Sequence, residues 1–184
     1  MADGLAQPSS LRAEPITLAA LVIAAVGAAT ILGALFFEYR LGLKPCPLCL
    51  EQRIAYYVAI PLALMVVAGV SVGSSRKVLM AALLAIAAAM LWNAGLGVYH
   101  SGVEWQWWEG PKDCSGEVAG FGSAGGLLKQ MQETSIVRCD EAAWRFLGLS
   151  LAGYNVLISL GLAAVALWGF WRAWQARPAA RQEG

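Results

Sequence analysis

The chain has 184 residues, of which 59% are hydrophobic and 14% are charged, and its formal net charge is +1. With a mean hydropathy of +0.60, it is too apolar for an ordinary soluble domain of this length, and the composition indicates an integral membrane protein. Because acidic and basic residues are scattered, no basic surface favours nucleic acid binding and no acidic tail indicates a solvating segment.

Four apolar runs are long enough to cross a membrane, at residues 16–37, 54–72, 78–99 and 147–171. A helix of about 20 residues spans the hydrocarbon core. The first run is longer than the roughly 7–15 residues of a signal-peptide core, so we expect a retained helix. Pro61 interrupts the second run, where a membrane helix tolerates it with a kink. We predict an all-α integral membrane protein, a four-helix transmembrane bundle that forms a single domain over residues 1–184.

Two polar loops connect these runs, a short one at 38–53 and a long one at 100–146. Four spans place both termini on one side of the membrane and both loops on the other. All four cysteines lie in the two loops, so we expect the loop side to be oxidising and the termini to be cytoplasmic. The tryptophans at 105–108 suit the headgroup zone, so we expect the long loop to lie partly on the membrane, with a short amphipathic helix at 127–131.

Cys46 and Cys49 form a C-x-x-C pair between the first two runs, and such pairs are often reactive because the thiol pKa is lowered. The prolines on either side of Cys46 keep this stretch from extending the preceding helix. In the chain-entropy model a Cys46–Cys49 bridge stabilises by only about 1.9 kcal/mol, against about 3.5 kcal/mol for Cys114–Cys139. The short pair is therefore the better candidate for redox chemistry, whereas the long pair suits a structural or a redox role.

Arg53 follows Cys49 by four residues, so the two side chains share a face if the second helix begins near Cys49. A guanidinium there, together with the helix N-terminus, favours a thiolate at Cys49. The structural alternative is an arginine that snorkels to the membrane interface. His100, the only histidine, ends the third run on the same side, where it can carry a proton or bond a carbonyl.

A dithiol at a membrane surface must pass its electrons to an acceptor. No phosphate-binding glycine motif follows a strand here, which favours a lipid-soluble quinone over a soluble nucleotide. We expect the quinone to bind where Cys49, Arg53 and His100 converge, with Leu96 and Leu151 as candidate walls.

Polar and small residues within the runs are expected to serve helix packing. The polar ones, which favour interhelical hydrogen bonds, are Asn93, Ser150, Asn155 and Ser159. The glycines predicted to allow close helix approach are Gly95, Gly97, Gly153 and Gly161.

Three features occur in a specific order along the chain. They are Lys44-Pro45-Cys46-Pro47-Leu48-Cys49 with Arg53 four residues on, His100 at the end of the third run, and Cys139-Asp140 with Trp144, Phe146, Leu147, Gly148 and Leu149 leading into the fourth. In these features, and over nearly its whole length, the chain resembles the disulfide bond formation protein B (DsbB) family of bacterial inner membranes.

The resemblance implies a protein-dithiol:quinone oxidoreductase of the inner membrane that reoxidises a periplasmic thioredoxin-like oxidant of the DsbA type. It implies that both loops are periplasmic and that all four cysteines are catalytic. Cys114 would form the mixed disulfide with the partner, and Cys139 would complete the loop pair and exchange with Cys46. Cys49 would be the thiolate that contacts the quinone.

The resemblance also implies that Arg53 and His100 assist Cys49 at the quinone, which would be ubiquinone or menaquinone from the membrane pool. The residues after Cys114, at 115–117, and the glycine-rich interval that follows depart from the family's pattern. A specialised paralogue that serves a dedicated oxidant is therefore an alternative.

Two hypotheses from other classes compete with the enzyme. In one, the four thiolates form a closed zinc site, but Cys114 and Cys139 lack the close spacing of a zinc knuckle, so we expect no metal. In the other, the chain is a non-catalytic membrane protein whose disulfides are structural. Thiol trapping in cells separates this from a relay, because structural disulfides stay fully oxidised.

Overall fold

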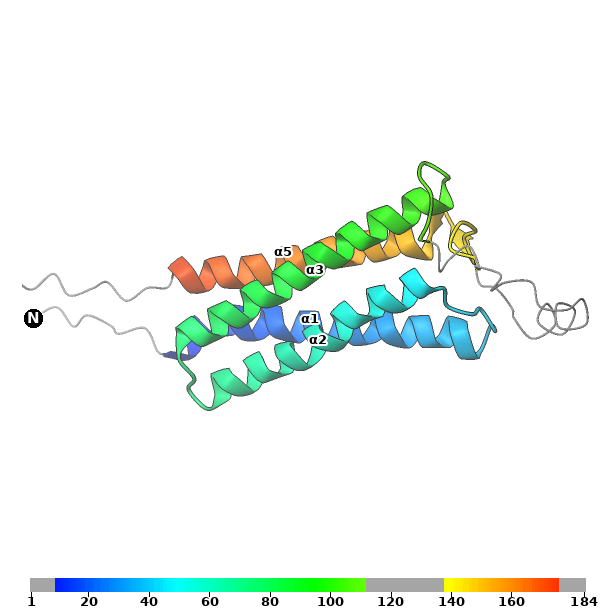
Figure 1. The fold of residues 1–184 in the computed structure, drawn as a ribbon. Helices are drawn as coiled ribbons and strands as arrows, with labels where there is room; N and C mark the ends of the chain where they lie inside the picture. The colour runs from blue at the N-terminus through cyan, green and yellow to red at the C-terminus, as the bar shows by residue number, and fades with distance from the viewer. Residues whose placement is uncertain (1–8, 112–137, 176–184) are drawn as a thin grey trace, which may run out of the picture.

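A computed structural model describes residues 9–111 and 138–175. The described chain forms four long helices that pack as an up-and-down bundle (Figure 1): α1 (Ser9–Tyr39), α2 (Pro47–Ser71), α3 (Arg76–Glu104) and α5 (Leu151–Gln175). Each of the four contains a segment long and apolar enough to cross a membrane. The predicted four-helix membrane bundle is confirmed, and the protein is a multi-pass membrane protein.

The second helix begins at Pro47, seven residues before the predicted start of the second run at 54. Cys46 caps this helix with extended backbone, and Pro47 occupies its first turn, where a missing N–H costs no hydrogen bond. The third helix extends to Glu104, five residues beyond the predicted end at 99. The dithiol and the histidine therefore lie on helix ends and not in loops.

The fourth helix begins at Leu151 because a tight hairpin precedes it. Strands β1 (Arg145–Phe146) and β2 (Leu149–Ser150) pair antiparallel. The two residues between them, Leu147 and Gly148, have φ angles of 49° and 83°. Positive φ at both central positions is the geometry of a tight two-residue hairpin turn.

The bundle core consists of aliphatic side chains together with Tyr56, which is 2% exposed. Helices approach closely at Gly97 and Gly169, where an added Cβ would lie 2.7 Å from Val156 and 2.7 Å from Ala19, respectively. The prediction of close packing was wrong for Gly95 and Gly161, because no atom lies within 4 Å of a Cβ placed there.

The start of α1, the turn between α2 and α3, and the end of α5 lie at one end of the bundle (Figure 1). The connection from α1 to α2, the end of α3 and the hairpin lie at the opposite end. The C-x-x-C segment and Cys139 thus share one end, as the sequence predicts. Cys114 and the predicted helix at 127–131 lie outside the described residues.

Candidate functional site

The first turn of α2 holds the two thiols together. Cys46 and Cys49 are free cysteines whose sulfur atoms lie 2.7 Å apart. The backbone N–H of Cys49 also donates to the Cys46 sulfur at 3.3 Å, because Cys46 is the N-cap residue. Cys46 is 3% exposed, and its contact with Cys49 and its burial raise the pKa of its thiol. This geometry suits a pair that opens and closes a disulfide.

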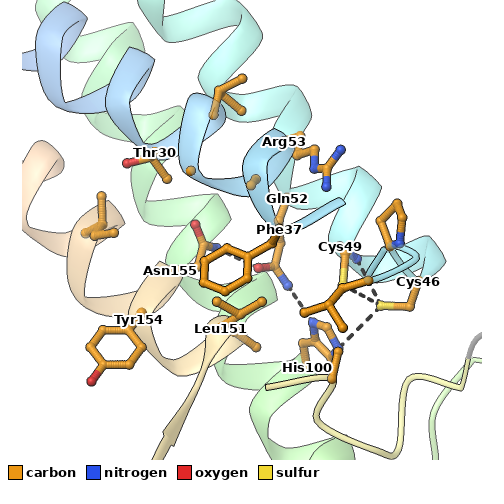
Figure 2. A pocket seen from close by; sticks show the side chains of 18 of the residues that line it. Thr30, Phe37, Cys46, Cys49, Gln52, Arg53, His100, Leu151, Tyr154 and Asn155 are labelled. Carbon is orange, nitrogen blue, oxygen red and sulfur yellow. Dashed lines mark hydrogen bonds between the residues drawn. The ribbon is translucent and has the colours of Figure 1, made fainter. Parts of the chain in front are cut away.

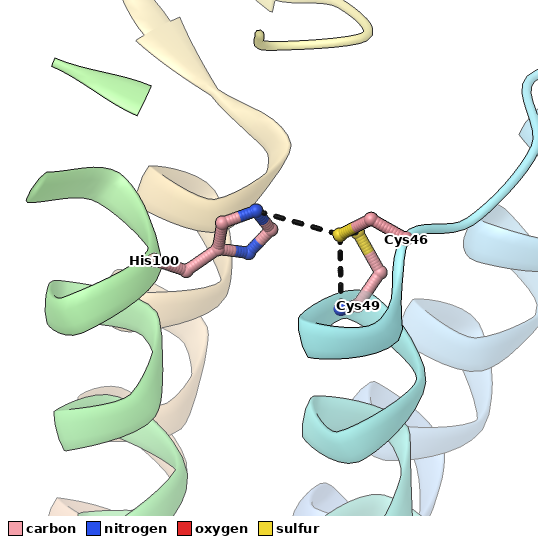
Figure 3. Close-up of side chains that lie close together, drawn as sticks. All are labelled: Cys46, Cys49 and His100. Carbon is pink, nitrogen blue, oxygen red and sulfur yellow. Dashed lines mark hydrogen bonds between the residues drawn. The ribbon is translucent and has the colours of Figure 1, made fainter. Parts of the chain in front are cut away.

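His100 reaches the dithiol from the last turns of α3 (Figure 3). Its Nε2 atom lies 3.6 Å from the Cys46 sulfur and 3.8 Å from Oε1 of Glu104, one turn further along. His100 and Glu104 are both buried. The other carboxylate oxygen of Glu104 has no hydrogen-bond partner among the described residues. The imidazole is therefore flanked by a sulfur and a carboxylate on the same ring nitrogen.

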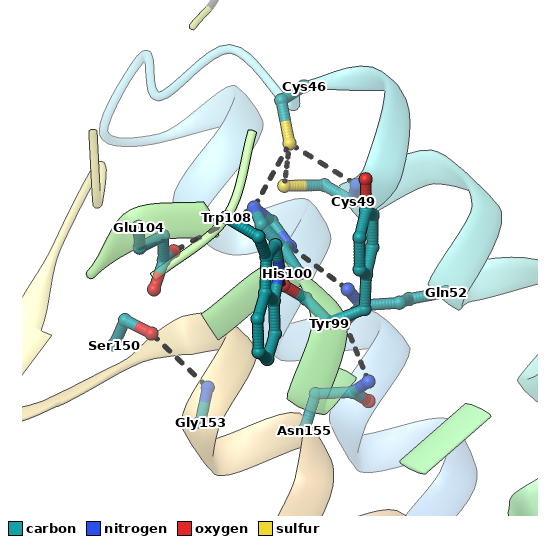
Figure 4. Close-up of polar contacts among 10 residues, drawn as sticks. All are labelled: Cys46, Cys49, Gln52, Tyr99, His100, Glu104, Trp108, Ser150, Gly153 and Asn155. Carbon is teal, nitrogen blue, oxygen red and sulfur yellow. Dashed lines mark hydrogen bonds and ion pairs between the residues drawn. The ribbon is translucent and has the colours of Figure 1, made fainter. Parts of the chain in front are cut away.

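A chain of amide side chains continues from His100 into the bundle (Figure 4). Nε2 of Gln52 lies 2.9 Å from Nδ1 of His100, and Nδ2 of Asn155 donates to Oε1 of Gln52 at 2.7 Å. Oδ1 of Asn155 accepts from the Tyr56 hydroxyl at 2.6 Å and from the Asn93 amide at 3.3 Å. The chain joins α2, α3 and α5, so the dithiol end is coupled to the buried centre of the bundle.

Beside the dithiol lies a cavity of about 310 Å³ (Figure 2). Its polar lining includes Cys49, Arg53 and His100, and much of the remainder is apolar surface from α1 and α5. Leu151 lines it as predicted, but Leu96 does not, because the cavity opens toward α1 and the first turns of α5. Cavities of this size and lining are typical of small-molecule sites.

Arg53 lines this cavity but is not a bare interfacial arginine. Its guanidinium forms an ion pair with Glu38 at the end of α1, with an N···O distance of 2.6 Å. The two side chains are only 13% and 24% exposed. The pair fixes the guanidinium at the cavity wall, and it links α1 to α2.

Cys139 joins the same end of the molecule from the segment before the hairpin. It is disulfide-bonded and fully buried. It packs in one buried cluster with Cys46, Leu48 and Val103. Its predicted disulfide partner, Cys114, lies outside the described residues.

The structure thus brings together Cys46, Cys49, Cys139, Arg53 and His100, which the sequence singled out. Sequence reasoning missed the residues that support them. These are Glu38, Gln52, Tyr56 and Glu104. Helical spacing could have pointed to Gln52 and Glu104. Gln52 lies one turn before Tyr56 on α2, and Glu104 lies one turn after His100 on α3.

Cys46, Cys49 and His100 offer three metal-ligand atoms within 4.8 Å of one another. Thiolates and an imidazole are zinc ligands. A metal-bound histidine, however, donates its other ring N–H to an acceptor. Here Nδ1 of His100 faces an amide nitrogen of Gln52, which can only donate, so this hydrogen bond does not fit a metal at Nε2.

Comparison with known proteins gives a consistent result. Residues 16–169 match the family model described as disulfide bond formation protein DsbB. A disulfide bond formation protein B from Psychrobacter sp. is 32% identical over 152 residues, covering 78% of this chain and 84% of the relative. The protein of that name from Methylococcus capsulatus is 31% identical over 151 residues, covering 79% and 88%.

A third relative, disulfide bond formation protein B of Xanthomonas oryzae pv. oryzae, is 32% identical over 141 residues, covering 73% of this chain and 78% of its own. No solved structure matches the chain significantly. The family match extends from α1 into α5 and includes the C-x-x-C turn, His100 and Cys139. The chain therefore belongs to the DsbB family of disulfide bond formation proteins.

Proposed function

We propose that this protein reoxidises the dithiol of a thioredoxin-like oxidant of the DsbA type and passes the electrons to a membrane quinone. The observation that carries the proposal is the shared cluster of the free Cys46 and the disulfide-bonded Cys139, with Cys49 packed against it. Exchange between two pairs requires a thiolate of one to reach a sulfur of the other. The packing of Cys46 and Cys139 in one buried cluster supports such an exchange.

The proposed relay has three balanced steps. The partner's two thiols reduce the Cys114–Cys139 disulfide and leave as the partner's disulfide. The loop dithiol then reduces a Cys46–Cys49 disulfide by way of a mixed disulfide between Cys139 and Cys46. Finally Cys46 and Cys49 close their disulfide again and release two electrons and two protons.

The residues around the cavity fit a quinone. Apolar side chains of α1 and α5, among them Phe37 and Leu151, supply a surface for a ring. Arg53 lies at the same cavity and offers N–H groups that suit a carbonyl oxygen, and His100 lines the cavity beside the two thiols. A bound quinone, ubiquinone or menaquinone, accepts two electrons and two protons.

The roles of the chain's own residues follow from their positions. Cys49 lines the cavity at the start of α2, where the helix dipole favours a thiolate. Arg53 keeps a positive charge at the cavity wall, and its remaining N–H groups can donate to a bound oxygen while Glu38 holds the guanidinium. Cys46 also lines the cavity and shares a buried cluster with Cys139, so we assign it the exchange with the loop pair.

This function requires a membrane between two compartments of different redox state. We infer a bacterial inner membrane location, with cytoplasmic termini and with the dithiol end of the bundle in the periplasm. Support comes from the placement of Cys46, Cys49 and Cys139 at one end of the bundle, because disulfides persist in the oxidising compartment.

The experiment is quinone reduction by the purified full chain, supplied with a reduced thioredoxin-like oxidant and a soluble quinone analogue. Cys49→Ser is expected to bring the rate down to the uncatalysed level. Ser71→Ala, a similarly small change at the other end of α2, is the matched control and keeps full turnover. Undiminished turnover in Cys49→Ser would overturn the proposal.

The partner step is tested separately by trapping. In a Cys139→Ser variant the free Cys114 thiolate attacks the disulfide of the oxidised partner, and the covalent complex through Cys114 is expected to accumulate because Cys139 is not there to displace the partner. Mass spectrometry identifies the attached protein and the cysteine that carries it. Attachment through Cys46 in place of Cys114 would reverse the proposed order of the two pairs.

A further inference from the structure

We propose that Gln52 and Asn155 fix the tautomer of His100, so that Nε2 carries the ring proton and donates a hydrogen bond to the sulfur of Cys46. His100 then serves as a hydrogen-bond donor to a Cys46 thiolate and not as the base that removes the thiol proton. Gln52 and Asn155 are positioning residues, because they act on Cys46 only through the imidazole.

The direction of the hydrogen bonds carries this inference. Asn155 uses its oxygen to accept from Tyr56 and Asn93, so its amide nitrogen donates to Oε1 of Gln52. Gln52 must then present its own nitrogen to Nδ1 of His100, 2.9 Å away. An amide nitrogen only donates, so Nδ1 accepts and the proton of a neutral ring lies on Nε2.

The other side of the ring gives an independent reason for the same tautomer. Nε2 of His100 faces two acceptors, the Cys46 sulfur at 3.6 Å and Oε1 of Glu104 at 3.8 Å. If the oxygen and nitrogen atoms of the Gln52 and Asn155 side-chain amides were exchanged, the ring proton would move to Nδ1. The lone pair of Nε2 would then point at a carboxylate oxygen, which is unfavourable in a buried site. Both faces of the imidazole therefore favour a proton on Nε2.

The donor matters because Cys46 is otherwise poorly placed to hold a negative charge. Its sulfur is buried, and the pKa of its thiol is raised by the adjacent Cys49 and by burial. Two N–H groups offset this, the backbone of Cys49 at 3.3 Å and Nε2 of His100 at 3.6 Å. Charge-assisted hydrogen bonds of this kind are about twice as strong as neutral ones.

The charge forms on Cys46 when the mixed disulfide with Cys139 is resolved, a step that rests on the proposed function. The thiolate of Cys114 attacks the sulfur of Cys139 and forms the loop disulfide. The bond from Cys139 to Cys46 breaks, and its electron pair stays on Cys46. An N–H already aimed at that sulfur stabilises the leaving thiolate, which speeds exchange.

The groups that face the imidazole from the packed elements are Cys46 and Cys49 on α2 and Glu104 on α3. Arg145 of the hairpin acts electrostatically on Glu104. These groups surround Nε2, whereas the Nδ1 side contacts the neutral amide of Gln52. A readout of the two ring nitrogens therefore separates the two sides.

The test uses the fact that the chain has a single histidine. The full chain is labelled with 15N-histidine, reconstituted in lipid nanodiscs and studied by NMR, which distinguishes a protonated from an unprotonated ring nitrogen. We expect a protonated Nε2 and an unprotonated Nδ1. A protonated Nδ1 in the native chain would overturn the inference, even where quinone turnover is intact.

Two substitutions sharpen this test. Gln52→Glu places a carboxylate oxygen against Nδ1, so the ring proton is expected to move from Nε2 to Nδ1. Glu51→Gln is the matched control, an exchange of amide and carboxylate on the exposed face of the same turn, and leaves the tautomer unchanged. An unchanged tautomer in Gln52→Glu would show that Gln52 does not set it.

The consequence for Cys46 is measured by its rate of alkylation as a function of pH, in a Cys49→Ala background where Cys46 is the only thiol of the pair. His100→Phe is expected to raise the pKa of Cys46 by about one unit, or to slow alkylation about 10-fold at a fixed pH below that pKa. An unchanged pH profile would overturn the donor role. Loss of quinone reduction with the tautomer intact would count against the proposed function alone.

Discussion

Removal of the Arg53 guanidinium tests how the first helix is attached to the site. Coulomb's law with an effective dielectric of about 20 gives about 6 kcal/mol for the gross attraction in the Arg53–Glu38 pair, whose N···O distance is 2.6 Å. Desolvation offsets most of this, because the side chains are only 13% and 24% exposed. We expect a net coupling of about 1–2 kcal/mol, above that of exposed pairs and below that of fully buried ones.

The coupling is measured by a double-mutant cycle of Arg53→Ala, Glu38→Ala and the double variant. The free energy of unfolding is determined for all four proteins in mixed detergent micelles. The double variant is expected to lose less stability than the two single variants add up to, because each single variant leaves a charge unpaired. Strictly additive losses would refute the view that this pair ties α1 to α2.

The same variants separate structure from quinone binding. Arg53→Ala is expected to raise the apparent KM for quinone about 10-fold, the effect of losing one charge-assisted hydrogen bond. Glu38→Gln keeps the guanidinium and is expected to leave the KM within about 3-fold of the native value. An unchanged KM in Arg53→Ala would remove Arg53 from the quinone site and leave it with the ion pair alone.

Three further predictions concern packing, pH and the polar chain. Gly169→Ala is expected to lower the free energy of unfolding by about 1–3 kcal/mol, because its Cβ would lie 2.7 Å from that of Ala19. Gly161→Ala in the same helix meets no atom within 4 Å and is expected to leave the stability unchanged or to raise it. Thermal unfolding compares the two variants. The hydrogen bonds and charge of Arg138 hold the pKa of Asp140 below its ordinary value, so the stabilisation is present above about pH 4 and is lost as the pH falls through the lowered pKa. Carboxyl NMR titration is expected to show the ordinary pKa for Asp140 in Arg138→Ala. An unchanged pKa in this variant would show that Arg138 does not lower it. Asn155→Leu leaves several buried donors and acceptors without a partner and is expected to lower the free energy of unfolding by about 2–4 kcal/mol. An unaltered stability would contradict this prediction.

Much of the architecture was predictable because a bilayer imposes strong constraints on sequence. Spans of about 20 apolar residues are required whatever the packing partners are. The placement of the dithiol at one end of the bundle followed from the order of spans and loops alone. Helix ends were less predictable. A proline such as Pro47 usually indicates a helix break, yet Pro47 is the first residue of α2.

The fourth span shows the same limit. Its apolar run includes Leu147 and Leu149, which hydropathy cannot distinguish from helical leucines. Leu147 has a positive φ in the hairpin turn, a conformation that leucine rarely adopts and that no local pattern predicts.

The redox residues were found because C-x-x-C has a recognisable spacing, whereas their supports have none. The ion pair joins Glu38 at the end of α1 to Arg53 on α2, and nothing in the sequence selects that acidic residue over the others. Gln52 and Asn155 are separated by 103 positions, so their contact exists only once the helices pack. Asn93, Asn155 and Ser159 were correctly assigned to interhelical hydrogen bonding, although Asn155 was not linked to the histidine that it serves. For Ser150 the hydrogen bond is local, because its hydroxyl accepts from the backbone N–H of Gly153.

The way in which α1 is attached has a consequence for how a hydrophobic molecule reaches the thiols. Among the described side chains, α1 is joined to another helix by a hydrogen bond only through Glu38, near the membrane surface. Between α1 and α5 the structure has no hydrogen bond among the described side chains, and both helices line the cavity. Parting these two helices sideways would break no hydrogen bond. We therefore expect a lipid-soluble molecule to enter from within the bilayer along this seam, without crossing the aqueous boundary.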